Sequence, residues 1–218
     1  MAQKDHLAAL KKSIVDLDFA AVAKAAQEAM AAGVDARTAI TDGMVPGMAV
    51  VGQKFESGEY FLSELIVAAE VMKEGLKVIN PYIKGPGAKK LGKVVIATIQ
   101  GDNHDIGKNI VSTLLGVQGF EVIDLGTDVS PEKIVKAVEE HRPAVVGLSA
   151  LLTVTMTRMG NVIKLLEANE LRNSVKVIIG GAPITPAFAE SIGADHAAAN
   201  AVEGVRKCAE WIGSKGGR

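Results

Sequence analysis

The stretch VVIATIQGDNHDIGKNIVSTLLG, residues 94–116, decides the fold. Its first six residues form a short apolar run rich in β-branched side chains, which is typical of a buried strand. A polar segment follows, and from Gly107 to Gln118 the apolar residues recur at helical spacing. A strand that passes through a polar loop into a helix is the opening of a strand–helix–strand unit.

The same alternation continues along the rest of the chain. We expect further strands at 121–124, at 144–149, at 176–179 and, weakly, near His196. The helices that we expect between and after them cover 131–141, capped by Ser130, and then 156–169, 186–192 and 200–212. Strands that alternate with helices predict an α/β fold with a parallel sheet covered on both faces, and five strands favour the flavodoxin-like doubly wound order.

The first 83 residues have a helical periodicity instead. Four stretches carry apolar residues at helical spacing, with Asp18 and Asp35 as caps, which predicts a small four-helix bundle. Gly43, Pro46 and Gly47 interrupt the third stretch, so we expect a kink or a close contact there. We therefore divide the chain into a helical domain, a Gly- and Lys-rich linker and a flavodoxin-like domain, with the boundaries 1–83, 84–92 and 93–218.

Composition narrows the classes of partner. The 218 residues are 48% hydrophobic and 22% charged with a net charge of −1, which is the profile of a globular protein. We expect no nucleic-acid partner, because no basic face is evident, and no membrane association, because there is no polybasic run and the apolar stretches are short enough to be buried strands or helix faces. The single cysteine, Cys208, rules out an internal disulfide and fits a cytoplasmic location.

Polar residues gather where the first, third and fourth predicted strands end, in the loops 101–107, 149–155 and 180–183. In this fold ligands bind outside the carboxyl ends of the strands, and the first and third strands are neighbours. Asp102 could hold one ring nitrogen of His104 while the other binds a metal. From the spacing alone we favour a plainer interpretation, in which His104 caps the next helix and Asp105 is a solvated acid.

The other possible ligands are scattered. His6, His104, His141, His196 and Cys208 form no paired spacing, whereas a zinc site needs three or four protein ligands. A lone histidine can bind a metal when a macrocycle supplies the remaining ligands, which points to haem or a corrinoid.

Phosphate-binding motifs do not fit this sequence. Five residues separate Gly101 from Gly107, and Asn109 follows Lys108 where a P-loop needs a hydroxyl residue, so we reject nucleotide hydrolysis and expect Lys108 on the exposed face of its helix. A dinucleotide site is also unlikely on this pattern, since no Gly-x-Gly-x-x-Gly follows the first strand. The pair at 180–181 is either a tight turn or a floor that a ligand approaches closely, and the sequence leaves both open.

Together these motifs resemble a known family. Asp102-x-His104-x-x-Gly107, then Ser149-x-Leu151 and then Gly180-Gly181 are similar to the signature of cobalamin-binding domains that hold the cofactor base-off and histidine-on. The run GDNHDIGKNIV resembles methyl-transferring members, such as the cobalamin module of methionine synthase and the corrinoid proteins of methanol, methylamine and O-demethylase systems. VVGQKFESGEYFLSELIVAAEVM resembles their helical cap, so the resemblance covers roughly residues 5–213. Because of this resemblance we now favour His104 as a metal ligand over His104 as a helix cap.

The resemblance implies a role for each matching residue. His104 would be the lower ligand of cobalt, Asp102 would bind its second ring nitrogen, and Thr155 would complete a proton relay. Phe55 and Leu62 match cap residues that lie over the methyl group. The remaining residues implied to contact the cofactor are Gly101, Asn103, Asp105, Ile106, Gly107, Ser149, Leu151, Thr153, Gly180, Gly181 and Ala201.

The function implied is that of a methyl carrier which works within a methyltransferase complex rather than alone. The cofactor would be cobalamin, as methylcobalamin or a related corrinoid with its cobalt ion, and the partners a donor-specific methyltransferase, an acceptor methyltransferase using tetrahydrofolate or coenzyme M, and a reductive activase. Two alternatives share the binding motif. A cobalamin-dependent sensor would need an output module, and the small subunit of an adenosylcobalamin mutase would not need the helical cap.

Overall fold

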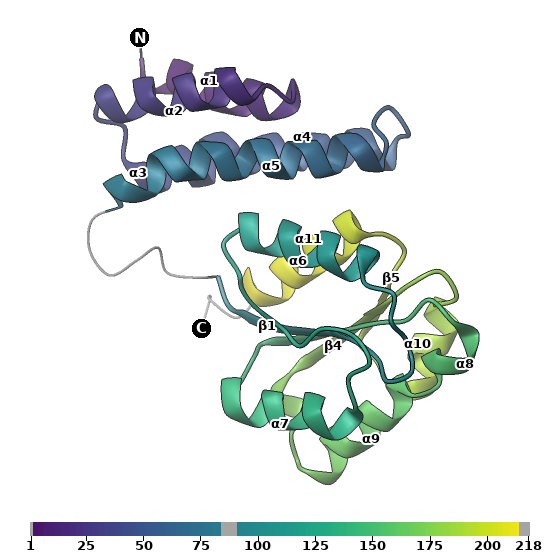
Figure 1. Ribbon diagram of the computed structural model, residues 1–218. Helices are drawn as coiled ribbons and strands as arrows, with labels where there is room; N and C mark the ends of the chain where they lie inside the picture. The colour runs from purple at the N-terminus through teal and green to yellow at the C-terminus, as the bar shows by residue number, and fades with distance from the viewer. Residues whose placement is uncertain (1, 84–90, 214–218) are drawn as a thin grey trace. The chain divides into compact units, whose positions relative to one another are not determined.

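The structure is a computed structural model that describes residues 2–83 and 91–213. The chain divides into two compact units, a helical unit Met1–Lys89 and an α/β unit Lys90–Arg218 (Figure 1). Within the described ranges, none of the helices has the length and apolar character needed to cross a membrane.

The predicted linker is described only at its end. Residues 84–90 lie outside the described part of the chain. Leu91 donates its backbone N–H to Gly119, and the carbonyl of Gly92 accepts from Glu121. These two residues therefore pair with the α/β unit.

The helical unit contains the four predicted helices. They are α1 (Gln3–Val15), α2 (Phe19–Ala31), α4 (Val45–Glu56) and α5 (Leu62–Ile79), with the short helix α3 (Ala36–Thr38) before α4. The Asp18 carboxylate accepts from the N–H of Ala21 at 2.9 Å and caps α2, and Asp35 caps α3 in the same way. The four-helix interpretation and both caps are confirmed.

The interruption of the third helix has a packing cause. Residues Ala39–Met44 form a π-helical turn between α3 and α4. A Cβ on Gly43 would lie 3.1 Å from Leu10 Cδ1, and one on Gly47 would lie 2.8 Å from Ile14 Cβ. The glycines let α1 approach this segment closely, so the predicted close contact is confirmed.

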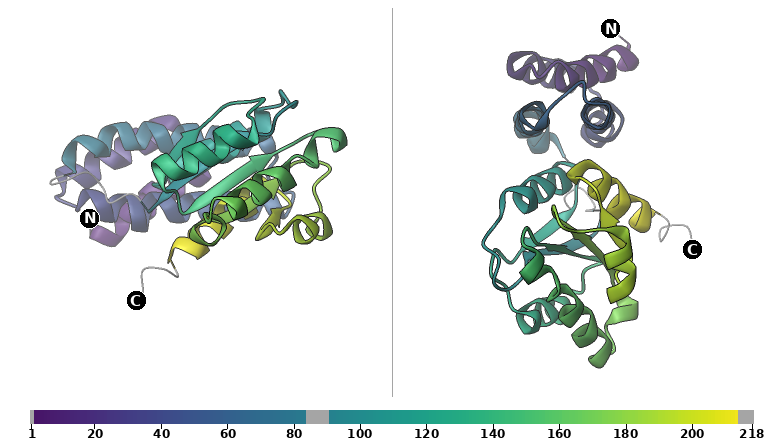
Figure 2. Two further views of the ribbon diagram at one scale, coloured as in Figure 1. Left: turned by 90° about the horizontal axis from the view of Figure 1, so that it is seen from below. Right: turned by 90° about the vertical axis from the view of Figure 1, so that its right-hand side faces the viewer.

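The α/β unit has the flavodoxin-like strand order. Five parallel strands pair in the order β2-β1-β3-β4-β5, which confirms the predicted fold. The strands are β1 (Lys93–Thr98), β2 (Glu121–Asp124), β3 (Val145–Ser149), β4 (Lys176–Gly180) and β5 (His196–Ala198). The main helices are α6 (Ile106–Val117), α7 (Pro131–His141), α9 (Met159–Ala168), α10 (Pro186–Ile192) and α11 (Ala201–Gly213). Helices α6 and α11 cover one face of the sheet, and α7 and α9 cover the other (Figures 1 and 2).

One predicted helix is wrong at its start. Instead of one helix over 156–169, the chain forms a short helix, α8 (Thr153–Met156), and then α9. The Thr155 hydroxyl lies 2.9 Å from both Leu152 O and Asp102 Oδ2. The chain therefore makes a separate turn around Asp102 before the long helix begins, and periodicity cannot show such a tertiary contact.

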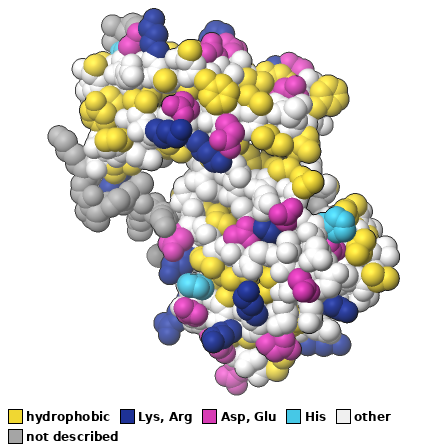
Figure 3. All heavy atoms as spheres, viewed as in Figure 1, with side chains coloured by type: hydrophobic (Ala, Val, Ile, Leu, Met, Phe, Trp, Pro, Cys, Tyr) yellow, Lys and Arg dark blue, Asp and Glu magenta, His cyan; other side chains and the backbone are white. Residues whose placement is uncertain are grey.

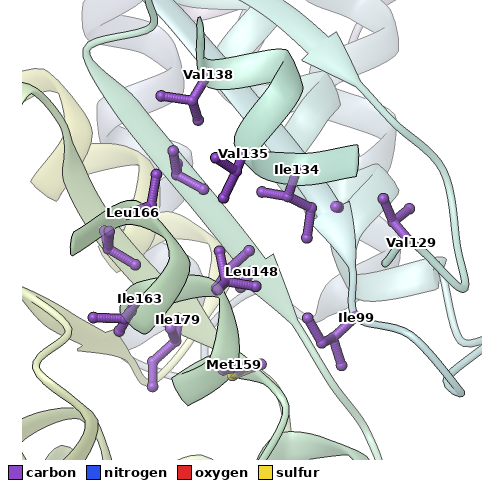
Figure 4. Packing of buried hydrophobic residues seen from close by; sticks show 14 of the residues in the cluster. Ile99, Val129, Ile134, Val135, Val138, Leu148, Met159, Ile163, Leu166 and Ile179 are labelled. Carbon is purple, nitrogen blue, oxygen red and sulfur yellow. The ribbon is translucent and has the colours of Figure 1, made fainter. Parts of the chain in front are cut away.

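The two faces of the sheet are packed differently. On the α7 and α9 side, strand residues such as Ala97, Leu148 and Ile179 join a continuous buried cluster (Figure 4). Helices α7 and α9 contribute the labelled residues Ile134, Val135, Val138, Met159, Ile163 and Leu166, and Ile99 and Val129 come from the segments that follow β1 and β2. On the α6 and α11 side, the wall of a cavity replaces part of this packing. The core that holds the unit together therefore lies mainly on the first side.

The surface carries charges of both signs. On the face drawn in Figure 3, lysine and arginine side chains are interspersed with aspartate and glutamate. Nearly balanced totals of 24 basic and 25 acidic residues agree with this mixture. That face offers no broad basic surface of the kind that binds nucleic acid.

Gly181 is where the fold tolerates a side chain least. Its φ is +130°, and an added Cβ would lie 1.8 Å from the carbonyl oxygen of Ala150. We predict that Gly181→Ala lowers the free energy of unfolding by about 3 kcal/mol or more, measured by chemical denaturation. Gly116→Ala in α6 is the control, because its Cβ would meet nothing within 4 Å and alanine favours a helix by about 1 kcal/mol. Equal stability of the Gly181→Ala protein and the parent would contradict this close approach.

Candidate functional site

Two loops meet at the carboxyl ends of β1 and β3. The first follows β1 and carries Asp102, whose side chain is fully buried. The second follows β3, and its Leu151 donates a backbone N–H to Asp102 Oδ2 at 2.8 Å. Since β1 and β3 are adjacent in the sheet, the switch point of the fold brings these loops together.

Asp102 is the most heavily hydrogen-bonded side chain of this region. Its Oδ1 accepts from the backbone N–H of His104 at 3.0 Å and lies 2.7 Å from His104 Nδ1. Its Oδ2 accepts from Leu151, from Leu152 at 3.2 Å and from the Thr155 hydroxyl at 2.9 Å. Burial alone would raise the pKa of Asp102, but the hydrogen bonds led by His104 outweigh it and hold the pKa well below its usual value.

An ionised Asp102 fixes the tautomer of His104. A carboxylate only accepts, so the proton of a neutral imidazole is held on Nδ1 and the lone pair lies on Nε2. The structure gives Nδ1 a protein partner and shows none for Nε2 among the described residues. The imidazole side chain is 52% exposed. His104 therefore presents a basic nitrogen at the surface of the α/β unit, supported from below by a buried negative charge.

Exposed apolar side chains lie on the segments that follow β1 and β3, as His104 does. Four that belong to the same loops or to the turns beside them are unusually exposed: Ile106 at 70%, Leu151 at 45%, Leu152 at 40% and Val154 at 75%. Exposed apolar side chains that gather in one place typically mark a binding surface. We call these four residues the apolar rim. An imidazole nitrogen within such a rim suits a broad, flat ligand with a metal at its centre.

A cavity of about 460 Å³ lies under α6 and α11, against β1, β3 and β4. Of the residues predicted to contact the cofactor, Gly107, Ser149, Gly180, Gly181 and Ala201 line it. The remainder of its wall is mostly small or apolar, including Val94, Ile96, Val111, Leu115, Gly147, Ile178, Ala198 and Gly204. Such a wall suits a largely apolar group.

The two adjacent glycines of this wall do different things. A Cβ on Gly180 would meet only Ala198 O at 3.8 Å, so this position leaves the cavity open. Gly181 instead permits the backbone to approach Ala150. The close approach at Gly181 is thus to the protein's own backbone, and the role of this pair as a floor for a ligand stays a prediction.

The other predicted residues are placed as follows. Leu151 lies on the loop after β3 and contributes its N–H to Asp102, and Thr153 is the first residue of α8. Phe55 of α4 is half-buried and Leu62 of α5 is 43% exposed, and both belong to the helical unit, so their role above the cofactor stays a prediction. The remaining predicted residues are exposed on the loop after β1 and at the start of α6: Gly101, Asn103, Asp105 and Ile106.

The expectation for Lys108 is wrong. The side chain is only 3% exposed and lines the cavity rather than facing solvent. Its ammonium donates to Asp124 Oδ2 at 2.6 Å and to Asn109 Oδ1 at 2.7 Å. Asp124 ends β2, 16 residues further along the chain. A charged residue was assigned to solvent because this partner is visible only in the folded structure.

Two further residues of this region were missed. Leu152 supplies a second backbone N–H to Asp102, and Thr98 donates its hydroxyl to the carbonyl of His104 at 2.9 Å. Neither residue stands out in the sequence. The contact of Leu152 is made by its backbone amide, which does not depend on the side chain, and Thr98 lies within an apolar run.

In the described ranges 2–83 and 91–213, no three His, Cys, Asp or Glu side chains gather to hold an ion. These ranges therefore contain no metal centre built from protein ligands alone. Cys208 lines the cavity, where burial raises the pKa of its thiol to about 12. The sulfur is therefore a neutral part of the wall rather than a thiolate ligand.

Comparison with known families assigns both units. Residues 92–206 match a family model described as a B12 binding domain, and residues 7–80 match a second model with the same description. The first match covers the strands and loops that carry Asp102, His104 and the cavity.

Individual relatives match nearly the whole chain. The trimethylamine corrinoid protein of Methanosarcina barkeri is 42% identical over 95% of this chain and 97% of its own length. The crystal structure of a cobalamin-binding protein from Desulfitobacterium hafniense superposes with a TM-score of 0.84 at 40% identity, covering 94% of this chain and 98% of the other. A chain of the methanol:cobalamin methyltransferase complex from Methanosarcina barkeri gives a TM-score of 0.82 at 30% identity, with coverage of 96% and 80%. The chain belongs to the B12-binding family, among the corrinoid proteins of methyltransferase systems.

Proposed function

We propose that this chain is a methyl carrier that holds a cobalamin-type cofactor base-off, with Nε2 of His104 as the lower ligand of cobalt. The observation that supports this most directly is the chain of hydrogen bonds from Thr155 through Asp102 to His104 Nδ1. It holds one ring nitrogen and leaves the other as a ligand on a half-exposed ring. This is the arrangement that a metal-binding histidine needs.

The residues present fit such a cofactor. A corrin supplies four equatorial nitrogens, so a single protein ligand is sufficient, and His104 is the histidine with an oriented ring beside the apolar rim. A base-off cofactor must place its detached nucleotide tail elsewhere, and the cavity of about 460 Å³ offers an apolar space with Gly180 in its wall. When bound, the cofactor supplies a cobalt centre that can accept a methyl group and give it up again.

The protein's own contribution is to control the lower ligand. Because Asp102 stays ionised, it stabilises a proton on Nδ1 and increases the electron density available at Nε2. The Thr155 hydroxyl donates to Asp102 and keeps the carboxylate in place.

The partners are proposed from the relatives. Two of the relatives are named trimethylamine and dimethylamine corrinoid proteins, and one similar structure is a methanol:cobalamin methyltransferase complex. We therefore propose a donor-specific methyltransferase as the first partner of this chain. An acceptor methyltransferase, using tetrahydrofolate or coenzyme M, and a reductive activase would complete the system. The chain would then be a component of the complex and not an enzyme by itself.

Replacing the proposed ligand tests this assignment. We expect the full chain to bind hydroxocobalamin with a visible spectrum typical of imidazole coordination and with the benzimidazole detached. His104→Ala should lose that spectrum and bind at least about tenfold more weakly, because the cobalt–nitrogen bond is gone. His196→Ala is the control, since His196 pairs with Glu203 away from the loop after β1. Identical spectra for the His104→Ala protein and the parent would rule out histidine coordination.

The role of Asp102 is tested by a change within the same loop. Asp102→Asn removes the charge that orients His104 and should weaken the imidazole–cobalt bond by about 10–100-fold, measured as the cyanide concentration that displaces it. The control is Glu139→Gln, which also replaces a carboxylate with an amide but at an exposed position of α7. It should leave the displacement unchanged. An equal effect of both substitutions would contradict a specific role for Asp102.

A substitution that fills the cavity tests whether the nucleotide tail, and not the corrin ring, binds there. Ala201→Phe should lower the affinity for cobalamin by about tenfold or more, because the side chain occupies space that we assign to the nucleotide tail. The affinity for cobinamide, a corrinoid that lacks this tail, should change little. Ala187→Phe, at an exposed position of α10, is the matched control. If Ala201→Phe weakened both corrinoids equally, the tail would not lie in this cavity.

A further inference from the structure

Thr98 is a buried polar residue that the proposed mechanism does not use. It is the last residue of β1, it is fully buried, and the preceding strand residues are mostly apolar. A buried hydroxyl is costly unless it forms a hydrogen bond, and a valine would otherwise fill the same place. The Thr98 hydroxyl donates to the carbonyl oxygen of His104 at 2.9 Å. The polar group therefore has a partner six residues away, at the predicted cobalt ligand itself.

The backbone of Thr98 is itself fixed. Its N–H donates to the carbonyl of Gly126 at 3.0 Å, and its carbonyl accepts from Val129 at 3.1 Å. It also lies in register with Ser149 of β3. The hydroxyl thus extends from the end of a strand that pairs with a neighbour on each side, and it can anchor the loop that follows.

The loop between Thr98 and His104 is held on its other side as well. Gly101 donates its N–H to Asp128 Oδ1 at 2.7 Å, and Arg158 Nη1 donates to the carbonyl of Gln100 at 2.9 Å. Asp128 has a φ of +53°, a conformation that is costly for a residue with a side chain. The loop is therefore positioned by contacts from the segments after β2 and β3 in addition to Thr98.

We propose that Thr98 is a positioning residue for the cobalt ligand, through its hydrogen bond to the main chain of His104. The inference rests on the proposed function, in which His104 binds cobalt. Asp102 holds the N–H and the ring of His104, and Thr98 holds its carbonyl. With the main chain held on both sides, the ring needs little further ordering when Nε2 binds. Preorganisation of this kind increases affinity by reducing the entropy lost on binding.

The test measures the strength of the axial bond rather than activity. Each full-length variant is saturated with hydroxocobalamin and titrated with cyanide at fixed pH, and absorbance gives the concentration that converts half of the cofactor to its dicyano form. Thr98→Val removes the hydroxyl with little change of shape, and we expect half-conversion at about tenfold lower cyanide, as for the loss of one buried hydrogen bond. Thr98→Ser keeps the hydroxyl and should restore the parent value.

Val146→Ala controls for a general loss of stability. Val146 lies on β3, is fully buried, and belongs to the cluster on the α7 and α9 side. The substitution should lower the thermal midpoint and leave the cyanide titration unchanged. If Thr98→Val does not fold, Thr98→Ala and Thr98→Ser allow the same comparison, because they differ by the hydroxyl alone.

The outcomes separate the two proposals. Cyanide displacement equal to the parent in Thr98→Val, or an equal shift in Thr98→Ser and Thr98→Val, would overturn the role of the hydroxyl. A comparable shift in Val146→Ala would also overturn it, because the effect would then be general loosening. If His104→Ala titrates like the parent, the proposed function itself fails. If His104→Ala changes the titration and Thr98→Val does not, only the role of Thr98 fails.

Discussion

The contact between Asp102 and His104 is the interaction on which the rest of the site depends. A fully buried carboxylate is unfavourable unless it is well hydrogen-bonded, and Asp102 has donors from both loops at this edge of the sheet. Those donors come together only because β1 and β3 are neighbours, which follows from the strand order. The short helix α8 belongs to the same arrangement, because the hydroxyl of its Thr155 donates to the same carboxylate. Fold and site are therefore linked through one negative charge.

The difference between the faces of the sheet follows from the choice of small residues. On the α7 and α9 side, branched and long side chains fill the space and supply the packing that stabilises the unit. On the α6 and α11 side, Gly180 leaves the wall of the cavity open, because a Cβ there would meet only Ala198 O at 3.8 Å. A protein that keeps an apolar space unfilled gives up stability in its free form and regains it when a ligand occupies the space. This loss of packing is consistent with our proposal that the cavity holds part of the cofactor.

The sequence was sufficient for the fold because local signals mark most of its boundaries. Ser130 before Pro131 starts α7, and its hydroxyl caps the helix as expected. The sequence was insufficient where a distant partner decides the outcome. Lys108 pairs with Asp124 on another element, and the spacing of charges in α6 alone assigns it to solvent. The order of the polar loops indicated where the site lies. Thr98, by contrast, lies within an apolar run, so nothing in the sequence showed that its hydroxyl contacts His104.

The low pKa of Asp102 also determines the charge beside His104. A carboxyl group that stays ionised acts as a hydrogen-bond acceptor, and the Thr155 hydroxyl donates to one of its oxygens at 2.9 Å. The other oxygen contacts the ring of His104, which is half-exposed. Thr155 and Asp102 therefore hold the ring in one orientation with a negative charge behind it, and the proton relay through these residues stays a prediction.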